Sequence, residues 1–168
     1  MLSCKQLLSM ICENIKIFLQ NVHKNNLIIN TILKIYLEFD IIFIQELSWT
    51  YIQSIPSPLN CEGKKVVGVP NHPNWVIFSR NPSNNRSYPR VLIYINIHIS
   101  SLCFSLQNNI FNHRDISCIF FFNHSSIQFL LNIYSDLSQS ALKYLKDTEA
   151  NLSNVLIITG NFNISDCL

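Results

Sequence analysis

The chain has 168 residues, of which 48% are hydrophobic and 13% are charged. This length predicts one domain or part of one, and the apolar content is ample for a core. The formal net charge of +2 is too small to indicate nucleic-acid binding by itself. The six cysteines form no C-x-x-C pair and have no zinc-type spacing with histidine. We therefore expect reduced thiols rather than a disulfide framework or a zinc site.

Residues 1–13 are expected to form a helical or irregular lead-in to a domain at 14–168. The short apolar patch from Leu7 to Cys12 has no small-residue cleavage site, so no signal peptide is predicted. No apolar run approaches the roughly 20 residues that a membrane-spanning helix needs. The sequence thus gives no indication that the chain binds a membrane. It leaves the oligomeric state open.

The first third of the chain predicts a strand, a helix and a second strand. A strand is expected at 15–22 and a helix at 27–37, where apolar residues recur at helical spacing after a capping Asn25 or Asn26. The run at 39–46 is apolar and rich in isoleucine, as in a strand that is covered on both faces. This order of strand, helix and strand is typical of a crossover unit.

After Trp49, prolines and a glycine separate short apolar runs. They predict strands joined by turns in an antiparallel sheet, at 65–69, 74–79, 90–99, 116–122 and 127–134. In the third run, isoleucines at 95, 97 and 99 alternate with Asn96 and His98, which indicates one wetter face. Residues 81–88 are expected to be a surface loop.

The C-terminal part predicts one helix and one strand. Ser138 is expected to cap a helix of about ten residues, with Leu142, Leu145 and Ala141 facing inward. The run Val155 to Ile158 reads as a buried strand that Gly160 ends. The expected class is α+β or mixed α/β, with sheet layers inside and helices outside.

Two predicted strands end in polar residues. Gln45 and Glu46 follow the apolar run at 39–44, and Asn161 and Asn163 follow the run at 155–158. Ligand groups often lie at the carboxyl ends of strands in open α/β sheets. Side by side, these two ends would form a polar, acid-containing site over a hydrophobic sheet.

Four short motifs, in order along the chain, resemble those of the endonuclease/exonuclease/phosphatase superfamily. They are Gln20-Asn21-Val22, Ile44-Gln45-Glu46, Asn132-Ile133-Tyr134-Ser135-Asp136 and Gly160-Asn161-Phe162-Asn163. Trp49 and the run from Tyr134 to Ser140 look most like the endonuclease domains of non-LTR (LINE-type) retrotransposons. The resemblance covers roughly residues 15–168 and implies a two-layer β-sandwich flanked by helices.

The resemblance also implies a reaction and a role for each residue. The family hydrolyses phosphodiesters with Mg²⁺ or Mn²⁺, which polarises the phosphate and stabilises the leaving oxygen. Glu46 would be the metal carboxylate, and Asn21 would help to position the metal or the phosphate. Tyr134 would hydrogen-bond a phosphate oxygen. Asn161 occupies the position of the residue that orients or deprotonates the attacking water, and Asn163 would contact phosphate.

DNA is the partner that the resemblance implies, with a nuclear location by analogy and no small-molecule cofactor. The sequence departs from the family in two places. Asn161 stands where the family has Asp, and an amide cannot accept a proton at neutral pH. The family's closing Ser-Asp-His is absent, because no Asp-His pair occurs in these 168 residues. We therefore expect an incomplete, degenerate retroelement-type domain without its C-terminal part, whose activity is impaired.

Three alternatives stay open from the sequence. The chain could be a catalytically inactive pseudoenzyme, a nucleic-acid-binding fragment, or a family member that acts on inositol phosphates or sphingolipids. No lipid-facing stretch supports the last of these. Five basic residues (Lys64, Lys65, Arg80, Arg86 and Arg90) could contact a DNA backbone or form a solvated face. The five histidines match no family motif and are expected to be structural or on the surface.

Overall fold

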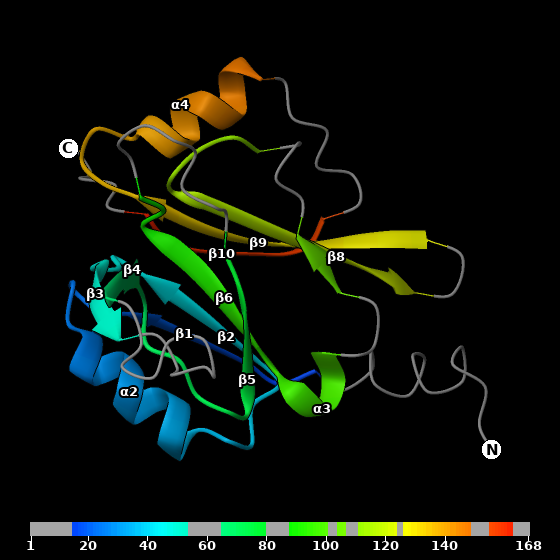
Figure 1. The fold of residues 1–168 in the computed structure, drawn as a ribbon. Coiled ribbons are helices and arrows are strands. Elements are labelled where there is room, and N and C mark those ends of the chain that lie inside the picture. The colour runs from blue at the N-terminus through cyan, green and yellow to red at the C-terminus, as the bar shows by residue number, and fades with distance from the viewer. Residues whose placement is uncertain are drawn as a thin grey trace.

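The structure, a computed structural model, describes residues 15–53, 65–79, 88–100, 104–106, 111–123, 126–148 and 155–162. The described part contains two four-stranded sheets, ordered β1-β2-β6-β5 and β10-β9-β8-β7, and a two-stranded sheet of β3 and β4. The predicted lead-in at 1–13 and the predicted loop at 81–87 lie outside the described residues. The expected two-layer sandwich with flanking helices is confirmed (Figure 1).

The elements have the following bounds in chain order. They are β1 (Ile17–Asn21), α2 (Asn26–Ile35), β2 (Ile41–Gln45), β3 (Thr50–Gln53), β4 (Lys65–Gly68), β5 (Trp75–Phe78), β6 (Val91–Asn96), α3 (Ile97–Ser100), β7 (Ser105–Leu106), β8 (Ile116–Asn123), β9 (Ser126–Ser135), α4 (Ser140–Asp147) and β10 (Val155–Phe162). None of the helices in these ranges is long and apolar enough to cross a membrane.

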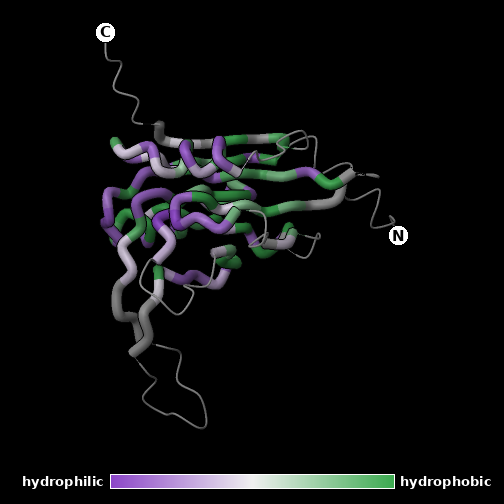
Figure 2. Tube along the Cα trace, turned by 90° about the horizontal axis from the view of Figure 1, so that it is seen from above, coloured by the Kyte–Doolittle hydropathy of each residue, from purple (hydrophilic) through white to green (hydrophobic). Residues whose placement is uncertain are grey.

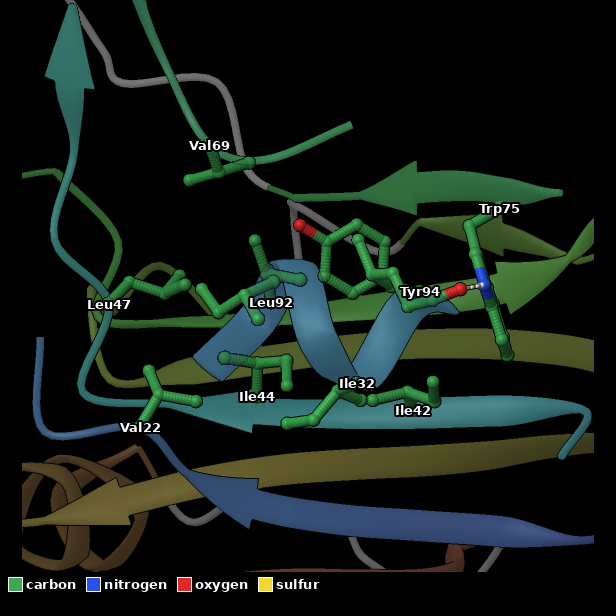
Figure 3. Close-up of a cluster of buried hydrophobic side chains, with 11 residues drawn as sticks. Val22, Ile32, Ile42, Ile44, Leu47, Val69, Trp75, Leu92 and Tyr94 are labelled. Carbon is green, nitrogen blue, oxygen red and sulfur yellow. Dashed lines mark hydrogen bonds between the residues drawn. The ribbon is translucent and has the colours of Figure 1, made fainter. Parts of the chain in front are cut away.

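Three hydrophobic clusters define four stacked layers. Between α2 and the first sheet, Ile32 packs with Ile42 and Ile44 (Figure 3), and Ile29 and Leu33 belong to the same cluster. Between the two sheets, the alternate residues Ile41 and Phe43 of the same strand pack with other apolar side chains. Because side chains alternate across a strand, all five residues of β2 are buried. The prediction of a strand covered on both faces is confirmed here.

The third cluster lies between the second sheet and α4. Ala141 of α4 is fully buried against Cys118, Leu131 and Ile133 of strands β8 and β9. Tyr144 and Leu145 pack against the same cluster. Burial raises the pKa of the Cys118 thiol to about 12, which fits the expectation of a reduced and unreactive cysteine there.

The first sheet begins with the predicted crossover unit. Strand β1 pairs with β2 in parallel, and α2 connects them across the outer face of the sheet (Figure 1). Asn25 is the N-cap of α2, because its side chain accepts a hydrogen bond from the backbone N–H of Leu27 at 3.0 Å. Strands β6 and β5 then add in antiparallel register.

The end of β6 corrects one prediction. The alternation of isoleucines with Asn96 and His98 predicted a strand through residue 99, but β6 ends at Asn96 and α3 follows. All six residues of β6 are buried, so this strand has no wetter face. Ile97 is exposed because it lies on the short helix.

The second sheet has antiparallel pairs β7–β8 and β8–β9 and one parallel pair, β9–β10. The predicted break at Gly160 is wrong, because β10 runs on to Phe162. The prediction that Val155 to Ile158 is covered on both faces is also wrong. Leu156 and Ile158 are exposed, since β10 is the outer strand of the sheet in the described part of the chain.

Helix α4 begins one residue later than predicted. Ser138 does not cap it. Its backbone N–H and its hydroxyl both bond to the Asp136 side chain, and Gln139 occupies the N-cap position without a side-chain cap bond. Gln139 has a left-handed backbone with φ of 52°. Asp136 therefore organises the turn that leads from β9 into α4.

Candidate functional site

The carboxyl ends of β1, β2 and β9 bring together residues from three of the four sequence motifs. Glu46 directly follows β2, and Tyr134 is the penultimate residue of β9. The Tyr134 hydroxyl donates a short hydrogen bond to Glu46 Oε1, across 88 positions of sequence. In Figure 2 the hydrophilic segments gather toward this end of the stacked strands. The sequence predicted that the end of β2 meets the end of β10; the contact seen here joins the end of β2 to the end of β9 instead.

The loop between β1 and α2 brings a histidine to the same carboxylate. His23 Nδ1 lies 2.8 Å from Glu46 Oε2, although most of the His23 side chain is exposed. Asn21 Oδ1 accepts a hydrogen bond from the His23 backbone N–H at 3.0 Å, and the Asn21 side chain also bonds to Glu46. His23 was expected to be structural or on the surface. Its side chain is exposed, and the structure adds its contact with Glu46.

The backbone around Glu46 is unusual. Glu46 has φ of 55° and His23 has φ of 46°, both in the left-handed region that disfavours residues with a β-carbon. The loop is nevertheless fixed, because Val22 N–H donates to Gln45 O at 3.0 Å and Lys24 N–H donates to Glu46 O at 2.7 Å. Such backbone geometry often accompanies functional sites.

Glu46 and Tyr134 are held in opposite protonation states. Burial alone would raise the pKa of Glu46, but hydrogen bonds from Tyr134, His23 and Asn21 outweigh it and hold this pKa below its usual value. Burial and the neighbouring carboxylate raise the pKa of Tyr134 to about 12. At neutral pH the site therefore presents an ionised carboxylate and a protonated phenol.

Arg90 supports the site from the start of β6. Its guanidinium binds both oxygens of Asp115, and Nη2 also contacts Asp136 Oδ2 at 2.9 Å. It also lies 4.8 Å from the centre of the Tyr134 ring. Bonding to Asp115 raises the pKa of Arg90 above its ordinary value, and bonding to Ser138 and Arg90 lowers that of Asp136 to about 2. Arg90 is thus ion-paired, and the suggestion that it contacts a DNA backbone is not supported.

Two buried amides join the sheets directly beneath the site. Gln45 Nε2 donates to Asn132 Oδ1 at 2.9 Å and to Ile133 O at 2.8 Å. Asn132 Nδ2 donates to the carbonyls of Ile44 and Leu92, each at 3.0 Å. Neither amide side chain is exposed. Gln45 and Asn132, the buried polar residues of these motifs, therefore have a structural role, because they fix the distance between the two sheets.

The remaining predicted site residues lie in or near β10. Asn161 is the register partner of Tyr134 in the parallel β9–β10 pair, so its backbone is next to the site. Asn163 lies outside the described residues, as do Lys64, Arg80 and Arg86. Trp49 is a packed aromatic residue, since its indole N–H donates to Pro89 O at 2.6 Å and its ring stacks on Tyr88.

The donor set suits a hard divalent ion that keeps much of its water. Mg²⁺ is commonly held by one or two carboxylates, and Glu46 supplies one ionised carboxylate beside the Asn21 amide. Within the described ranges, no group of three or more His, Cys, Asp and Glu side chains is arranged to hold a metal ion. Glu46 and Asn21 are the residues that would hold such an ion.

Comparison with known proteins finds a similar fold among solved structures. No family model matches the chain, and no curated protein matches it. Among solved structures, the endonuclease domain of TRAS1, a telomere-specific non-LTR retrotransposon, is similar over 88% of this chain, with 13% identity and a TM-score of 0.47. The matched region is 58% of the length of that domain. At this identity and TM-score the likeness says nothing about residues or activity.

Proposed function

We propose that the chain is a phosphodiesterase domain of the endonuclease type, which acts on DNA with a divalent metal ion and whose activity is impaired. The observation that carries the proposal is the contact between Glu46 and Tyr134 at the ends of two strands from different sheets. The four motifs that resemble the endonuclease/exonuclease/phosphatase superfamily supply the reaction class.

The local charges favour a metal-dependent reaction over direct phosphate binding. The site and its support contain the carboxyl groups of Glu46, Asp115 and Asp136, and Arg90 is paired with two of them. A phosphate diester would meet an excess of negative charge there. A divalent cation on Glu46 would offset that charge and polarise the phosphate when it is bound.

The protein groups would then act as follows. Glu46 stays ionised at neutral pH, so it can hold the cation. Tyr134 keeps its proton, so its hydroxyl can turn from Glu46 to a phosphate oxygen and stabilise the charge that develops there. Asn21 would orient the cation or the phosphate. Asn161 can orient a water molecule, but its amide cannot take the proton from it.

Nicking of supercoiled plasmid DNA tests this proposal. The unaltered chain with Mg²⁺ or Mn²⁺ should be slow, because loss of a general base costs about 10²–10⁴ in rate. Asn161→Asp, alone and in a version extended by a family-type C-terminal segment, should nick faster. EDTA or an added Glu46→Gln change should abolish the gain. If the folded, extended Asn161→Asp protein does not nick DNA, the proposed reaction is wrong.

A second candidate function is nucleic-acid binding without cleavage, which the amide at position 161 favours. It predicts salt-dependent DNA binding by the unaltered chain. It also predicts that binding is retained in Glu46→Gln, and that neither the extension nor Asn161→Asp produces nicking. The same plasmid assay, combined with a filter-binding measurement at two salt concentrations, therefore separates the two functions.

A further inference from the structure

We propose that His23 and Glu46 act as a nitrogen–oxygen ligand pair, which makes the site select a divalent transition-metal ion over Mg²⁺. This inference rests on the proposed function, because it names the class of metal at the same site. The resemblance assigns Mg²⁺ or Mn²⁺ to Glu46 and Asn21, and it gives no role to His23.

The first argument is that His23 is positioned next to the carboxylate by the backbone. Two main-chain hydrogen bonds, from Val22 N–H and Lys24 N–H, attach the residues on either side of His23 to the end of β2. A third bond, from the His23 N–H to Asn21 Oδ1, fixes His23 itself. The imidazole therefore lies at Glu46 because of the loop conformation, and a surface side chain without these bonds would not be held there.

The second argument is the distance between the two candidate ligand atoms. His23 Nδ1 and Glu46 Oε2 are 2.8 Å apart. Two ligands that each lie about 2.1 Å from a metal ion, at a right angle, are about 3 Å apart. The separation of the two atoms therefore suits a shared cation, which lies off the line between them, once the imidazole ring turns to direct Nδ1 at the ion.

The third argument is ligand chemistry. Mg²⁺ takes oxygen ligands and retains its waters. Imidazole instead favours zinc, copper, iron and nickel, and affinity for such sites rises from Mn²⁺ to Cu²⁺, with Zn²⁺ below Cu²⁺. A site with one imidazole nitrogen and one carboxylate oxygen should therefore bind transition-metal ions more tightly than Mg²⁺.

The other end of the first sheet provides a matched control. His98 Nε2 lies 2.9 Å from Asp40 Oδ1, and the His98 side chain is also mostly exposed. Asp40 Oδ2 also accepts a hydrogen bond from the Lys16 N–H at 2.8 Å, and Asn96 Oδ1 accepts one from the His98 N–H at 3.5 Å. Asp40 precedes β2 and Glu46 follows it, so His98→Ala removes a similarly placed imidazole without altering the candidate site.

The test measures metal binding directly. Mn²⁺ affinity of the full chain is followed by the loss of the free-ion EPR signal, with Mg²⁺ as competitor. Electron spin-echo modulation of the bound Mn²⁺ detects a directly coordinated imidazole nitrogen. The variants are His23→Ala, Glu46→Gln and the control His98→Ala, each checked for folding by circular dichroism.

We expect the unaltered chain to prefer Mn²⁺ to Mg²⁺. His23→Ala should lower Mn²⁺ affinity at least about 10-fold and remove the nitrogen modulation. The same change should not lower Mg²⁺ affinity. His98→Ala should change none of these. If His23→Ala keeps both Mn²⁺ affinity and the nitrogen modulation while Glu46→Gln loses binding, the ligand role of His23 is wrong and the metal site stands. If neither ion binds and Glu46→Gln matches the unaltered chain, the metal-dependent function itself is wrong.

Discussion

Gln45 and Asn132 form a hydrogen bond between the two sheets, with Gln45 Nε2 lying 2.9 Å from Asn132 Oδ1, and both side chains are fully buried. Each amide also bonds to main-chain carbonyl groups, so the pair satisfies polar atoms of three strands. Gln45 directly precedes Glu46, and Asn132 lies two residues before Tyr134. The bridge therefore links the stability of the sandwich to the geometry of the site.

Replacing Asn132 with Leu should destabilise the protein by about 2–4 kcal/mol. The change removes the Asn132 donor from the carbonyls of Ile44 and Leu92 and the Asn132 acceptor from Gln45 Nε2, and loss of a buried hydrogen-bond partner costs about 1–3 kcal/mol. Chemical denaturation measures the free energy of unfolding. A loss below about 0.5 kcal/mol would show that these carbonyls find other partners.

Replacing Arg90 with Met should destabilise the protein by about 2–3 kcal/mol, because it removes both charged hydrogen bonds of the fully buried Asp115 carboxylate and leaves it with the Ser140 hydroxyl at 3.4 Å and with Arg114 at 3.8 Å. Arg90→Met combined with Asp115→Leu should recover much of this loss. The comparison uses urea unfolding of the three proteins at pH 7. Equal stability of the single and double variants would contradict the ion-pair argument.

Replacing Tyr134 with Phe should raise the pKa of Glu46. The hydroxyl of Tyr134 is the strongest of the hydrogen bonds that lower this pKa. Carboxyl ¹³C NMR of labelled protein, titrated from pH 2 to pH 7, follows the ionisation of Glu46 in both proteins. Tyr36→Phe is a suitable control, because this tyrosine packs on Phe18 at the other side of the first sheet. An unchanged Glu46 titration would argue against the hydrogen bond.

Stability should fall at both ends of the pH range because of the site residues. The pKa of Glu46 and that of Asp136 are lowered in the folded state. Their stabilising effect is therefore present above about pH 4, the pKa of these groups in the unfolded chain. It is lost as pH falls through their pKa values in the folded protein. Tyr134 has a raised pKa, so its contribution is present below about pH 10 and is lost as pH rises toward 12. Tyr134→Phe should flatten the alkaline fall in a thermal-melt series; an unchanged alkaline fall would contradict the shifted tyrosine.

Replacing Ile158 with Lys should lower self-association without a large loss of stability. Ile158 and Leu156 are exposed on β10, and an apolar outer strand is a site for unwanted pairing between chains. Light scattering against protein concentration measures the effect. Ile133→Lys, in the buried cluster under α4, is the contrasting variant and should unfold the protein.

Local patterns in the sequence predicted most strands, because their apolar runs are strong. Strand β2, helix α2 and its Asn25 cap follow directly from period and capping chemistry. The failures have specific causes. Residues 97–99 alternate like a strand, but Ile97 N–H bonds to Asn74 O and the chain turns into α3. The strand β10 runs through Gly160, since glycine weakens a strand without ending one that is paired along its length.

The candidate site was predicted in part. The motifs placed Glu46, Tyr134 and Asn21 at strand ends, and the structure brings these three together. His23 and the Arg90–Asp115 pair were missed, because single basic residues carry no periodic pattern and their partners are far apart in sequence. The only hint for His23 was its place two residues after Asn21, in the same strand-end turn.

The long separation between Glu46 and Tyr134 has a consequence for how the molecule folds. The β8–β9 hairpin pairs residues close in sequence and can form early, whereas the contact between these two side chains closes a loop of 88 positions. We expect the site to be complete only when the two halves of the chain have docked. The chemical shifts of the Tyr134 ring would then report when the last step of folding is complete.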